Sequence, residues 1–253
     1  MTRFARLSIP WIVPTLSLVT AEVYCRTFGV GSDTLAPPIT AVWALFRAGA
    51  NGSLWGATLF TLATASAGMA IGTLLGVSTG VCLGMWRRGR RAAFLSVEVF
   101  RAIPAIALIP LSMLLLGFGM GMEVSIAAFA TFWPSLIFTT AAVLQIDRQL
   151  FEVSALLRLG PLQRCLKIIL PAIVPRLLVA MRFAIGMALI ASVTVEIVAN
   201  PFGMGYAMMF AQQSLNPSLM QAWLLWIGLL GYAIHLATIR LETALARRMG
   251  AII

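Results

Sequence analysis

Charged residues are scarce in this sequence of 253 residues. Only 10% of the residues are Asp, Glu, Lys or Arg, whereas 60% are hydrophobic and the mean hydropathy is +0.97. Soluble domains have about a quarter of their residues charged. This chain therefore lacks the polar side chains that a water-soluble globule of its size needs at its surface. The composition excludes such a globule and predicts an integral membrane protein.

Histidine and cysteine are also scarce. The one histidine is His235, and the three cysteines, Cys25, Cys82 and Cys165, are far apart. Neither a disulfide framework nor a Cys/His metal site can be built from them, and a membrane-embedded hydrolase needs a histidine cluster or paired carboxylates. The sequence also has no G-x-x-x-x-G-K-[ST] loop to bind nucleotide phosphates. We expect no catalytic residue, no metal site and no cofactor.

Long apolar runs take up most of the chain. A transmembrane helix needs about 20 apolar residues at about 1.5 Å rise each. We predict one all-α transmembrane domain covering residues 1–253. An uncharged run from Ala48 to Trp86 contains the second span and is longer than the hydrocarbon, so it should tilt, protrude or break near its outer end. The six predicted spans are residues 7–25, 55–86, 102–122, 124–146, 177–198 and 219–239.

Positive charges are distributed unequally between the two sides of these spans. With the N-terminus inside, only Arg26 and Arg47 lie on the outer side, which leaves 16 of the 18 Lys and Arg residues inside. The positive-inside rule then places both termini in the cytoplasm. This distribution accounts for the net charge of +10 without a nucleic-acid partner. A signal peptide cleaved after Val19-Thr20-Ala21 is the alternative interpretation of the first span.

The longest inner connection runs from Asp147 to Arg176 and has the pattern of a helical hairpin. Asp147 can cap a helix from Arg148 to Leu159, Gly160 suits the position that ends it, and Pro161 and Pro171 begin and close a second helix. The apolar residues Leu150, Val153 and Leu157 fall on one face of the first helix, with Phe151 and Ala155 beside them. This apolar ridge either packs on the inner ends of the spans or docks on a partner.

Several motifs in this connection and around it resemble a known family. Glu152-Val153-Ser154 and Ile168-x-Leu170-Pro171 look like the EAA loop of inner-membrane permease subunits of ATP-binding cassette (ABC) importers, with the Glu and the last Pro 19 positions apart. The order of the further segments is similar to that in the nitrate, sulfonate and taurine branch of this family. These segments are Arg101-Ala-Ile-Pro104, Pro110, Phe118-Gly-Met-Gly121, Phe132-Trp-Pro134, Arg182, Glu196, Gly203-Met-Gly205-Tyr206 and Ile227-Gly-Leu-Leu-Gly231.

The resemblance implies a type I importer permease of the bacterial inner membrane. Such a permease would work as a homodimer with two copies of a cytoplasmic ABC ATPase subunit and with an extracytoplasmic solute-binding protein. It would carry a small anion such as a sulfonate, taurine or nitrate. The alternative is a secondary transporter driven by an ion gradient, which needs carboxylates near the bilayer midplane. The residues expected to couple to the ATPase are Glu152, Ser154, Ala155, Gly160, Ile168, Leu170 and Pro171.

The loop departs from the family pattern at one position. The family has a glycine six residues after the Glu, where this sequence has Arg158. We therefore expect the break between the two loop helices to be shifted by two residues, to Gly160.

Glycine recurs every fourth residue along the second predicted span. This period produces a groove into which another helix backbone can settle closely. Packing within one subunit is the favoured interpretation, and lining of a dimer interface or of the pore is the alternative. The glycines are Gly68, Gly72, Gly76, Gly80 and Gly84.

Few charges fall within the predicted spans. Glu22, Arg182 and His235 are close enough to span ends to reach the lipid headgroups. Glu196 lies near the outer end of the fifth span, where it either faces the outer water or is held by a partner. The uncharged segment from Asn200 to Pro217 suits an outer loop or half-embedded hairpin. We predict Glu196, Gly203, Gly205 and Tyr206 as possible pathway or outer-gate residues.

A cluster of four arginines lies at the inner end of the second predicted span. The cluster is Arg87-Arg88-Gly89-Arg90-Arg91. Basic residues near an anionic membrane surface attract its headgroups. We expect this segment to anchor the topology of the chain and to bind membrane lipid.

Overall fold

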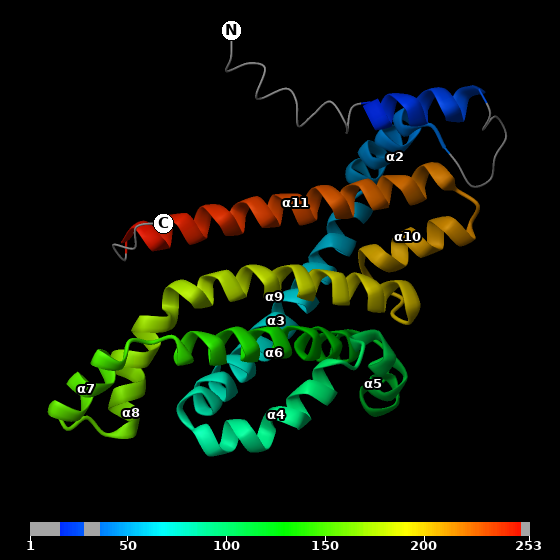
Figure 1. Cartoon of the computed structure of the whole chain (residues 1–253). Coiled ribbons are helices and arrows are strands. Elements are labelled where there is room, and N and C mark those ends of the chain that lie inside the picture. Colours follow the sequence, from blue (N-terminus) through cyan, green and yellow to red (C-terminus); the bar gives the residue numbers. More distant parts are fainter. Residues whose placement is uncertain (1–15, 28–35, 249–253) are drawn as a thin grey trace, which may run out of the picture. The chain divides into compact units, whose positions relative to one another are not determined.

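The computed structural model of the chain describes residues 16–27 and 36–248, and the regular structure in these residues is entirely helical (Figure 1). The all-α prediction is confirmed for this part of the chain. The helices are residues 16–27, α2 (Pro38–Ala50), α3 (Ser53–Met85), α4 (Arg87–Arg101), η1 (Ala105–Leu108), α5 (Ile109–Leu116), α6 (Met120–Leu144), α7 (Arg148–Leu156), α8 (Pro161–Arg164), η2 (Cys165–Ile169), α9 (Leu170–Val198), α10 (Gly203–Gln213) and α11 (Pro217–Arg248).

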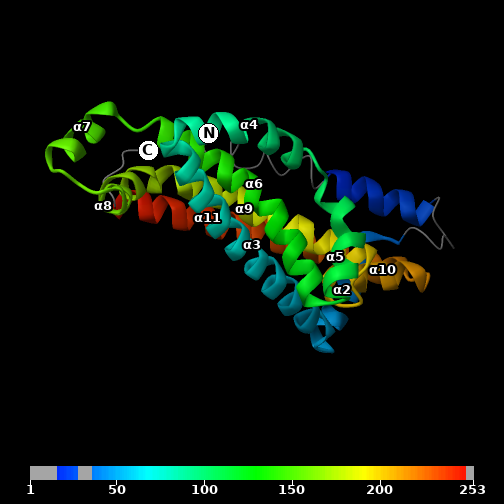
Figure 2. The same cartoon turned by 90° about the horizontal axis from the view of Figure 1, so that it is seen from below.

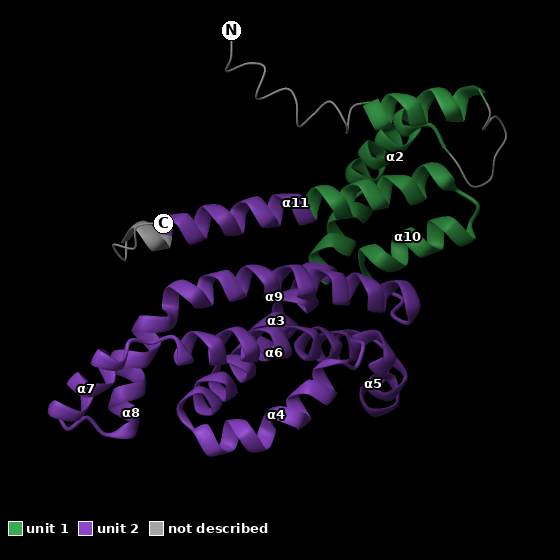
Figure 3. Cartoon of the chain, in the orientation of Figure 1, with its two compact units in different colours: residues 1–60, 202–230 green, residues 61–201, 231–253 purple. Residues whose placement is uncertain are grey.

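The chain divides into two compact units (Figure 3). Unit 1 contains residues 1–60 and 202–230, and unit 2 contains residues 61–201 and 231–253. Each is described by itself. The long helices α3 and α11 contribute residues to both units.

Helix α6 is the central element of unit 2. It lies beside α9 in both Figure 1 and Figure 2, and the glycines of α3 also contact it. Eleven of its residues are buried. One apolar cluster at the C-terminal end of α6 joins four helices and is formed by Val81, Ala142, Val143, Ile169 and Ile173.

Four helical segments in the described residues are long and apolar enough to cross a membrane. They are α3, α6, the run from Pro161 to Gln213 that contains α9, and α11, and they correspond to the second, fourth, fifth and sixth predicted spans. A fifth span exists if α4 and the segment Ala105–Leu116 are one broken span, bent by 84°. Residues 7–15 of the first predicted span lie outside the described residues, and residues 16–25 belong to the helix of residues 16–27.

The third predicted span, residues 102–122, is wrong as a single helix. The structure instead has a short 3-10 turn followed by the eight-residue α5. Pro104 lacks an N–H and forces the residue before it out of helical geometry. Gly117 and Gly119, with φ of 72° and 110°, then end α5 and re-aim the chain into α6.

The expected break in the long uncharged run lies between α2 and α3. Asn51 and Gly52 separate the two helices, and Gly52 has a φ of 78° that favours glycine. The prediction of a break near this end is confirmed. The 33 residues of α3 still span about 50 Å at 1.5 Å per residue, more than the hydrocarbon thickness.

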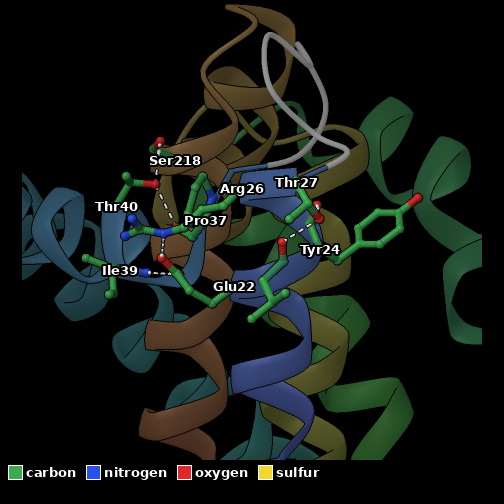
Figure 4. Close-up of polar contacts among 9 residues, drawn as sticks. Glu22, Tyr24, Arg26, Thr27, Pro37, Ile39, Thr40 and Ser218 are labelled. Carbon is green, nitrogen blue, oxygen red and sulfur yellow. Dashed lines mark hydrogen bonds and ion pairs between the residues drawn. The ribbon is translucent and has the colours of Figure 1, made fainter.

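Unit 1 is held by polar contacts between helices that are distant in sequence (Figure 4). Glu22 accepts hydrogen bonds from Arg26 Nε (2.6 Å) and from the backbone N–H of Ile39 (3.1 Å). The Ser218 hydroxyl donates to Thr40 Oγ1 (3.2 Å). The Glu22 carboxylate is thus bonded within the protein, and its position at the headgroups stays a prediction.

Candidate functional site

Helix α7 begins as the sequence predicts. The Asp147 side chain accepts a hydrogen bond from the backbone N–H of Gln149 (3.0 Å), which satisfies one of the unpaired donors of the first turn. Glu152 is exposed and lies 3.5 Å from Arg148 in an i,i+4 pair. Such exposed pairs contribute little stability, so the Glu152 carboxylate is available to a partner.

The end of α7 corrects the predicted position of the break. Leu159 N–H donates to Ser154 O (3.1 Å) and Arg158 N–H to Ala155 O (3.0 Å), which are the two bonds of a Schellman motif with Arg158 at C′. Arg158 has the left-handed φ of 50° that this position requires. Gly160 instead has a φ of −64° and caps α8. The break therefore stays at Arg158, because the hydrogen-bond pattern that ends the helix overrides the side-chain preference.

The prediction that Pro171 closes the second loop helix is also wrong. The helix continues from Pro161 through a π turn at Cys165–Ile169 into α9. Leu170 N–H donates to Cys165 O, five residues back, and Pro171 lies in the first turn of α9. A π turn shifts the hydrogen-bond register by one residue, which accommodates the missing N–H of the proline.

The loop exposes large apolar side chains on both of its helices. Leu156 is 82% exposed and Leu162 is 72% exposed. In the predicted ridge, Leu150, Val153 and Leu157 are exposed, whereas Phe151 packs on the protein itself. The full set of exposed apolar residues, called here the coupling surface, is Leu150, Val153, Leu156, Leu157, Leu162 and Leu166.

The opposite side of this segment is anchored in unit 2. Phe151 packs against the apolar cluster of α3, α6 and α9, and Ile169 is fully buried in it. Ser154 is buried and donates to Phe151 O (2.6 Å). Arg176 Nη1 donates to Ala142 O (3.1 Å), which ties the start of α9 to α6. Of the other predicted coupling residues, Ala155, Gly160 and Pro171 are exposed, and Ile168 and Leu170 are half-buried.

The glycines of α3 lie against the backbone of α6. A Cβ added to Gly76 would lie 2.6 Å from Phe132 O, and one added to Gly80 would lie 2.7 Å from the Thr139 Cβ. Real Cβ atoms do not approach so closely. The same holds for Gly68, Gly72 and Gly84, whose neighbours are Ala127, Thr131 and Val143. The groove is therefore filled by another helix of the same chain.

The segment after α9 forms helix α10 rather than an extended loop. Gly203 begins this helix with a φ of 89°, and both Gly203 and Gly205 are buried. Tyr206 is exposed on the next turn, with its ring 6.0 Å from that of Phe210. The role of these residues at an outer gate stays a prediction.

Comparison with known proteins identifies the family. Residues 68–251 match the family described as "Binding-protein-dependent transport system inner membrane component". The chain belongs to this family. The resemblance drawn from the coupling motifs is confirmed, and the apolar helices agree with a multi-pass position in the inner membrane.

Curated relatives of this permease are named for two kinds of substrate. The chain is 31% identical over 186 residues to the putative aliphatic sulfonates transport permease protein SsuC of Bacillus subtilis, covering 73% of this chain and 67% of the relative. It is 28% identical over 222 residues to the Escherichia coli protein of the same name, covering 88% and 84%. The bicarbonate transport system permease protein CmpB of Synechocystis is 27% identical over 186 residues, covering 73% and 66%.

Solved ABC transporters share the fold of this permease. A chain of the inward-facing MetNI methionine ABC transporter matches with a TM-score of 0.67 at 23% identity, covering 80% of this chain and 96% of that one. A chain of a bacterial alginate ABC transporter, solved in complex with an alginate pentasaccharide-bound periplasmic protein, matches with a TM-score of 0.61 at 14% identity, covering 98% of each chain. These likenesses establish the type I importer fold.

Sequence reasoning missed one buried charge in this permease. Glu123 is fully buried in the first turn of α6, but it fell at the boundary between the third and fourth predicted spans. Glu196 is also buried, so the expectation that it could face the outer water is wrong. The signal that could have found Glu123 is its position as the one carboxylate between Ala102 and Ile146, in a chain where each intramembrane charge is a functional candidate.

Proposed function

We propose that this chain is the permease subunit of an ATP-driven importer and that its coupling surface docks on a cytoplasmic ABC ATPase subunit. The observation that carries the proposal is the apolar surface of α7 and α8, which nothing in the described residues covers. An exposed apolar patch of this kind marks an interaction site. An amphipathic helix can lay its apolar side in a groove of a partner.

The anchoring of the same segment supports a role in transmitting motion. A contact can drive the spans only if the segment moves with them as a rigid body. Phe151 and Ile169 are packed into the cluster that joins α3, α6 and α9, and the Arg176 hydrogen bond adds a polar link to α6. A displacement of the coupling surface would therefore move these three helices together.

The remaining parts of the transporter follow from this proposal. Since the chain offers one coupling segment, two copies of the chain would supply the contacts for two ATPase subunits. An extracytoplasmic binding protein would deliver the solute at the other side, and ATP would be hydrolysed in the ATPase subunits. Both termini and the coupling surface would be cytoplasmic, as the distribution of Arg and Lys predicts.

The substrate that we propose is a small anion. The sulfonates and bicarbonate for which relatives are named share a negative charge, and the sequence motifs favoured a sulfonate, taurine or nitrate. Unit 1 also has a pocket of about 770 Å³ that contains one guanidinium. Arg47, Asn51, Ser53, Asn216 and Ser218 are among its lining residues. Guanidinium, amide and hydroxyl groups suit an oxyanion.

The test of the coupling surface replaces one of its exposed side chains. Leu156→Asp should reduce recovery of the ATPase subunit in co-purification by roughly tenfold or more, because an unpaired charge would enter an apolar contact. Ala155→Asp and Glu152→Lys should weaken the same contact. Each variant should still insert in the membrane, since these positions lie outside the spans. Solute uptake should fall together with ATPase recovery.

Leu215→Asp is the matched control. Leu215 is 67% exposed and lies just after α10, on the predicted outer side, so this variant should recover the ATPase as the wild type does. Wild-type ATPase recovery by Leu156→Asp, Ala155→Asp and Glu152→Lys would contradict the proposed contact. The substrate is tested separately. The affinities of the purified binding protein for sulfonates, nitrate and bicarbonate would identify the anion.

A further inference from the structure

The pocket of about 770 Å³ in unit 1 lies along one face of α2. Trp43, Arg47 and Asn51 line it at intervals of four residues, which places them one above the other along the helix and its C-terminal end. Asn216, the residue before α11, lines the pocket as well. The pocket therefore combines polar groups from two parts of the sequence that are far apart.

Arg47 is the one charged group in the described residues of unit 1 that has no opposite charge beside it. These residues contain three charged side chains, those of Glu22, Arg26 and Arg47. Glu22 and Arg26 form an ion pair (2.6 Å). Arg47 is exposed and makes no ion pair or side-chain hydrogen bond with any described residue. A guanidinium has five N–H donors and no acceptor, so this pocket contains a positive charge with unused donors.

Two asparagines add amide donors to this charge. Asn216 Oδ1 accepts a hydrogen bond from the backbone N–H of Leu219 (3.1 Å) and so caps α11, which leaves the NH₂ end of this amide for the pocket. The Asn51 side chain makes no hydrogen bond with any described residue. The described lining of the pocket includes no carboxylate. A set of donors around a positive charge suits an oxyanion, whose oxygens accept several charge-assisted hydrogen bonds.

The same pocket also has apolar walls. Ala44 and Ala48 on α2 and Leu219 on α11 line it together with the Trp43 ring. Pockets of about 300–1,000 Å³ hold drug-sized ligands, so a nitrate or bicarbonate ion would fill only a small part of this one. An oxyanion that carries an alkyl group would use both the donors and the apolar walls.

We propose that this Arg47 pocket, defined by Trp43, Arg47, Asn51 and Asn216, is an oxyanion-binding site on the permease itself and that its ligand is an alkanesulfonate. The proposal rests on the proposed import of a small anion. Arg47 binds the sulfonate oxygens, the two amides complete their hydrogen bonds, and the Trp43 ring contacts the alkyl group. The predicted topology places Arg47 on the outer side, where the solute arrives. The phosphate of an anionic phospholipid has the same oxyanion chemistry, and the test separates these two sources.

The test measures anion binding to the purified full-length chain by titration calorimetry, in a non-ionic detergent and without ATPase or binding protein. Butanesulfonate should bind more tightly than methanesulfonate, nitrate or bicarbonate, because its alkyl group buries apolar surface. Arg47→Gln should weaken butanesulfonate binding by roughly tenfold or more, since it removes a charge-assisted hydrogen bond. Arg47→Lys should recover part of the affinity, because lysine keeps the charge without the planar fork.

Asn216→Asp separates binding from stability. This variant keeps the oxygen that caps α11 but replaces the amide donor with a negative charge. It should lose butanesulfonate binding at an unchanged or higher melting temperature, because aspartate suits the N-terminus of a helix. Arg26→Gln is the matched control. It removes the other arginine on the predicted outer side, which does not line the pocket, and it should bind butanesulfonate as the wild type does.

Each contrary outcome has a distinct meaning. Equal butanesulfonate affinity in the wild type, Arg47→Gln and Asn216→Asp would overturn the assignment of the site. Binding that disappears when phosphatidylglycerol replaces phosphatidylcholine in nanodiscs would overturn the alkanesulfonate as ligand and assign the pocket to a lipid phosphate. A wild type that recovers the ATPase but binds no butanesulfonate would contradict this inference alone. A wild type that binds butanesulfonate but recovers no ATPase would contradict the proposed function alone.

Discussion

Two regions of the molecule show regular patterns in the sequence: the contact of α3 with α6, and the coupling surface on α7 and α8. The structure covers the first region and exposes the second. The small residues of α3 are covered by another helix of the same chain. The large residues of the coupling surface are exposed. The regularly spaced glycines of α3 therefore indicate a contact within the chain. The regularly spaced apolar residues of the coupling surface indicate a surface that the described residues leave exposed.

The difference follows from what drives each contact. In lipid, apolar side chains gain little from burial, so helices associate by close backbone packing, which small residues permit. Outside the bilayer, exposed leucine costs free energy in water, roughly 25 cal/mol for each Å² of apolar surface. An open apolar surface of this kind marks an interaction site, which supports the proposed contact with an ATPase subunit.

The largest expected effect comes from filling the glycine groove. Gly76→Leu should destabilise the protein by about 3 kcal/mol or more, because its side chain has no space beside Phe132 O and the Ser135 side chain. The measurements are thermal unfolding in detergent and recovery of monodisperse protein. Gly56→Ala is the matched control on the same helix, since a Cβ there meets no atom within 4 Å. Equal stability of the two variants would show that the α3–α6 contact is not close.

A smaller effect is expected from two truncations that separate the anchored and open sides of the coupling segment. Ile173→Ala removes a fully buried side chain from the cluster at the end of α6 and should cost about 2–3 kcal/mol of stability. Leu162→Ala removes an exposed side chain and should change the free energy of unfolding by less than about 0.5 kcal/mol. Leu162→Ala should nevertheless reduce ATPase recovery. A stability loss in Leu162→Ala equal to that in Ile173→Ala would mean that the surface is an internal contact.

The smallest expected effect concerns the break after α7. Arg158→Gly should stabilise the protein by about 1 kcal/mol, because glycine adopts the left-handed φ of 50° without the steric cost that arginine has. Gly160→Ala should be neutral or slightly stabilising, since Gly160 has an ordinary φ and open space around it. Thermal unfolding of both variants measures the difference. If Gly160→Ala lowers the stability and Arg158→Gly does not raise it, the break between the two loop helices lies at Gly160 instead.

Much of the coupling segment could be predicted from local chemistry. Asp147 caps α7 as expected, because an N-cap needs only a short acceptor before the first turn. The position of the break could not be predicted, because the hydrogen bonds of Leu159 and Arg158 outweigh the preference of glycine for that geometry. The prediction that Pro171 ends a helix was wrong for a similar reason. The π turn before Pro171 shifts the hydrogen bonds by one residue, so the helix continues although the proline has no N–H.

The sequence alone determined the class of this protein, the position of its long helices and its family. These properties depend on composition, on apolar run length and on motifs read along the chain, and none of them requires a contact between distant residues. The tertiary structure decided which surfaces are covered and which charges are buried. Glu123 of α6 and Glu196 of α9 are both buried, and each accepts a hydrogen bond from a threonine of α3. Burial of a carboxyl is a property of its neighbours in space, so only the folded chain shows it.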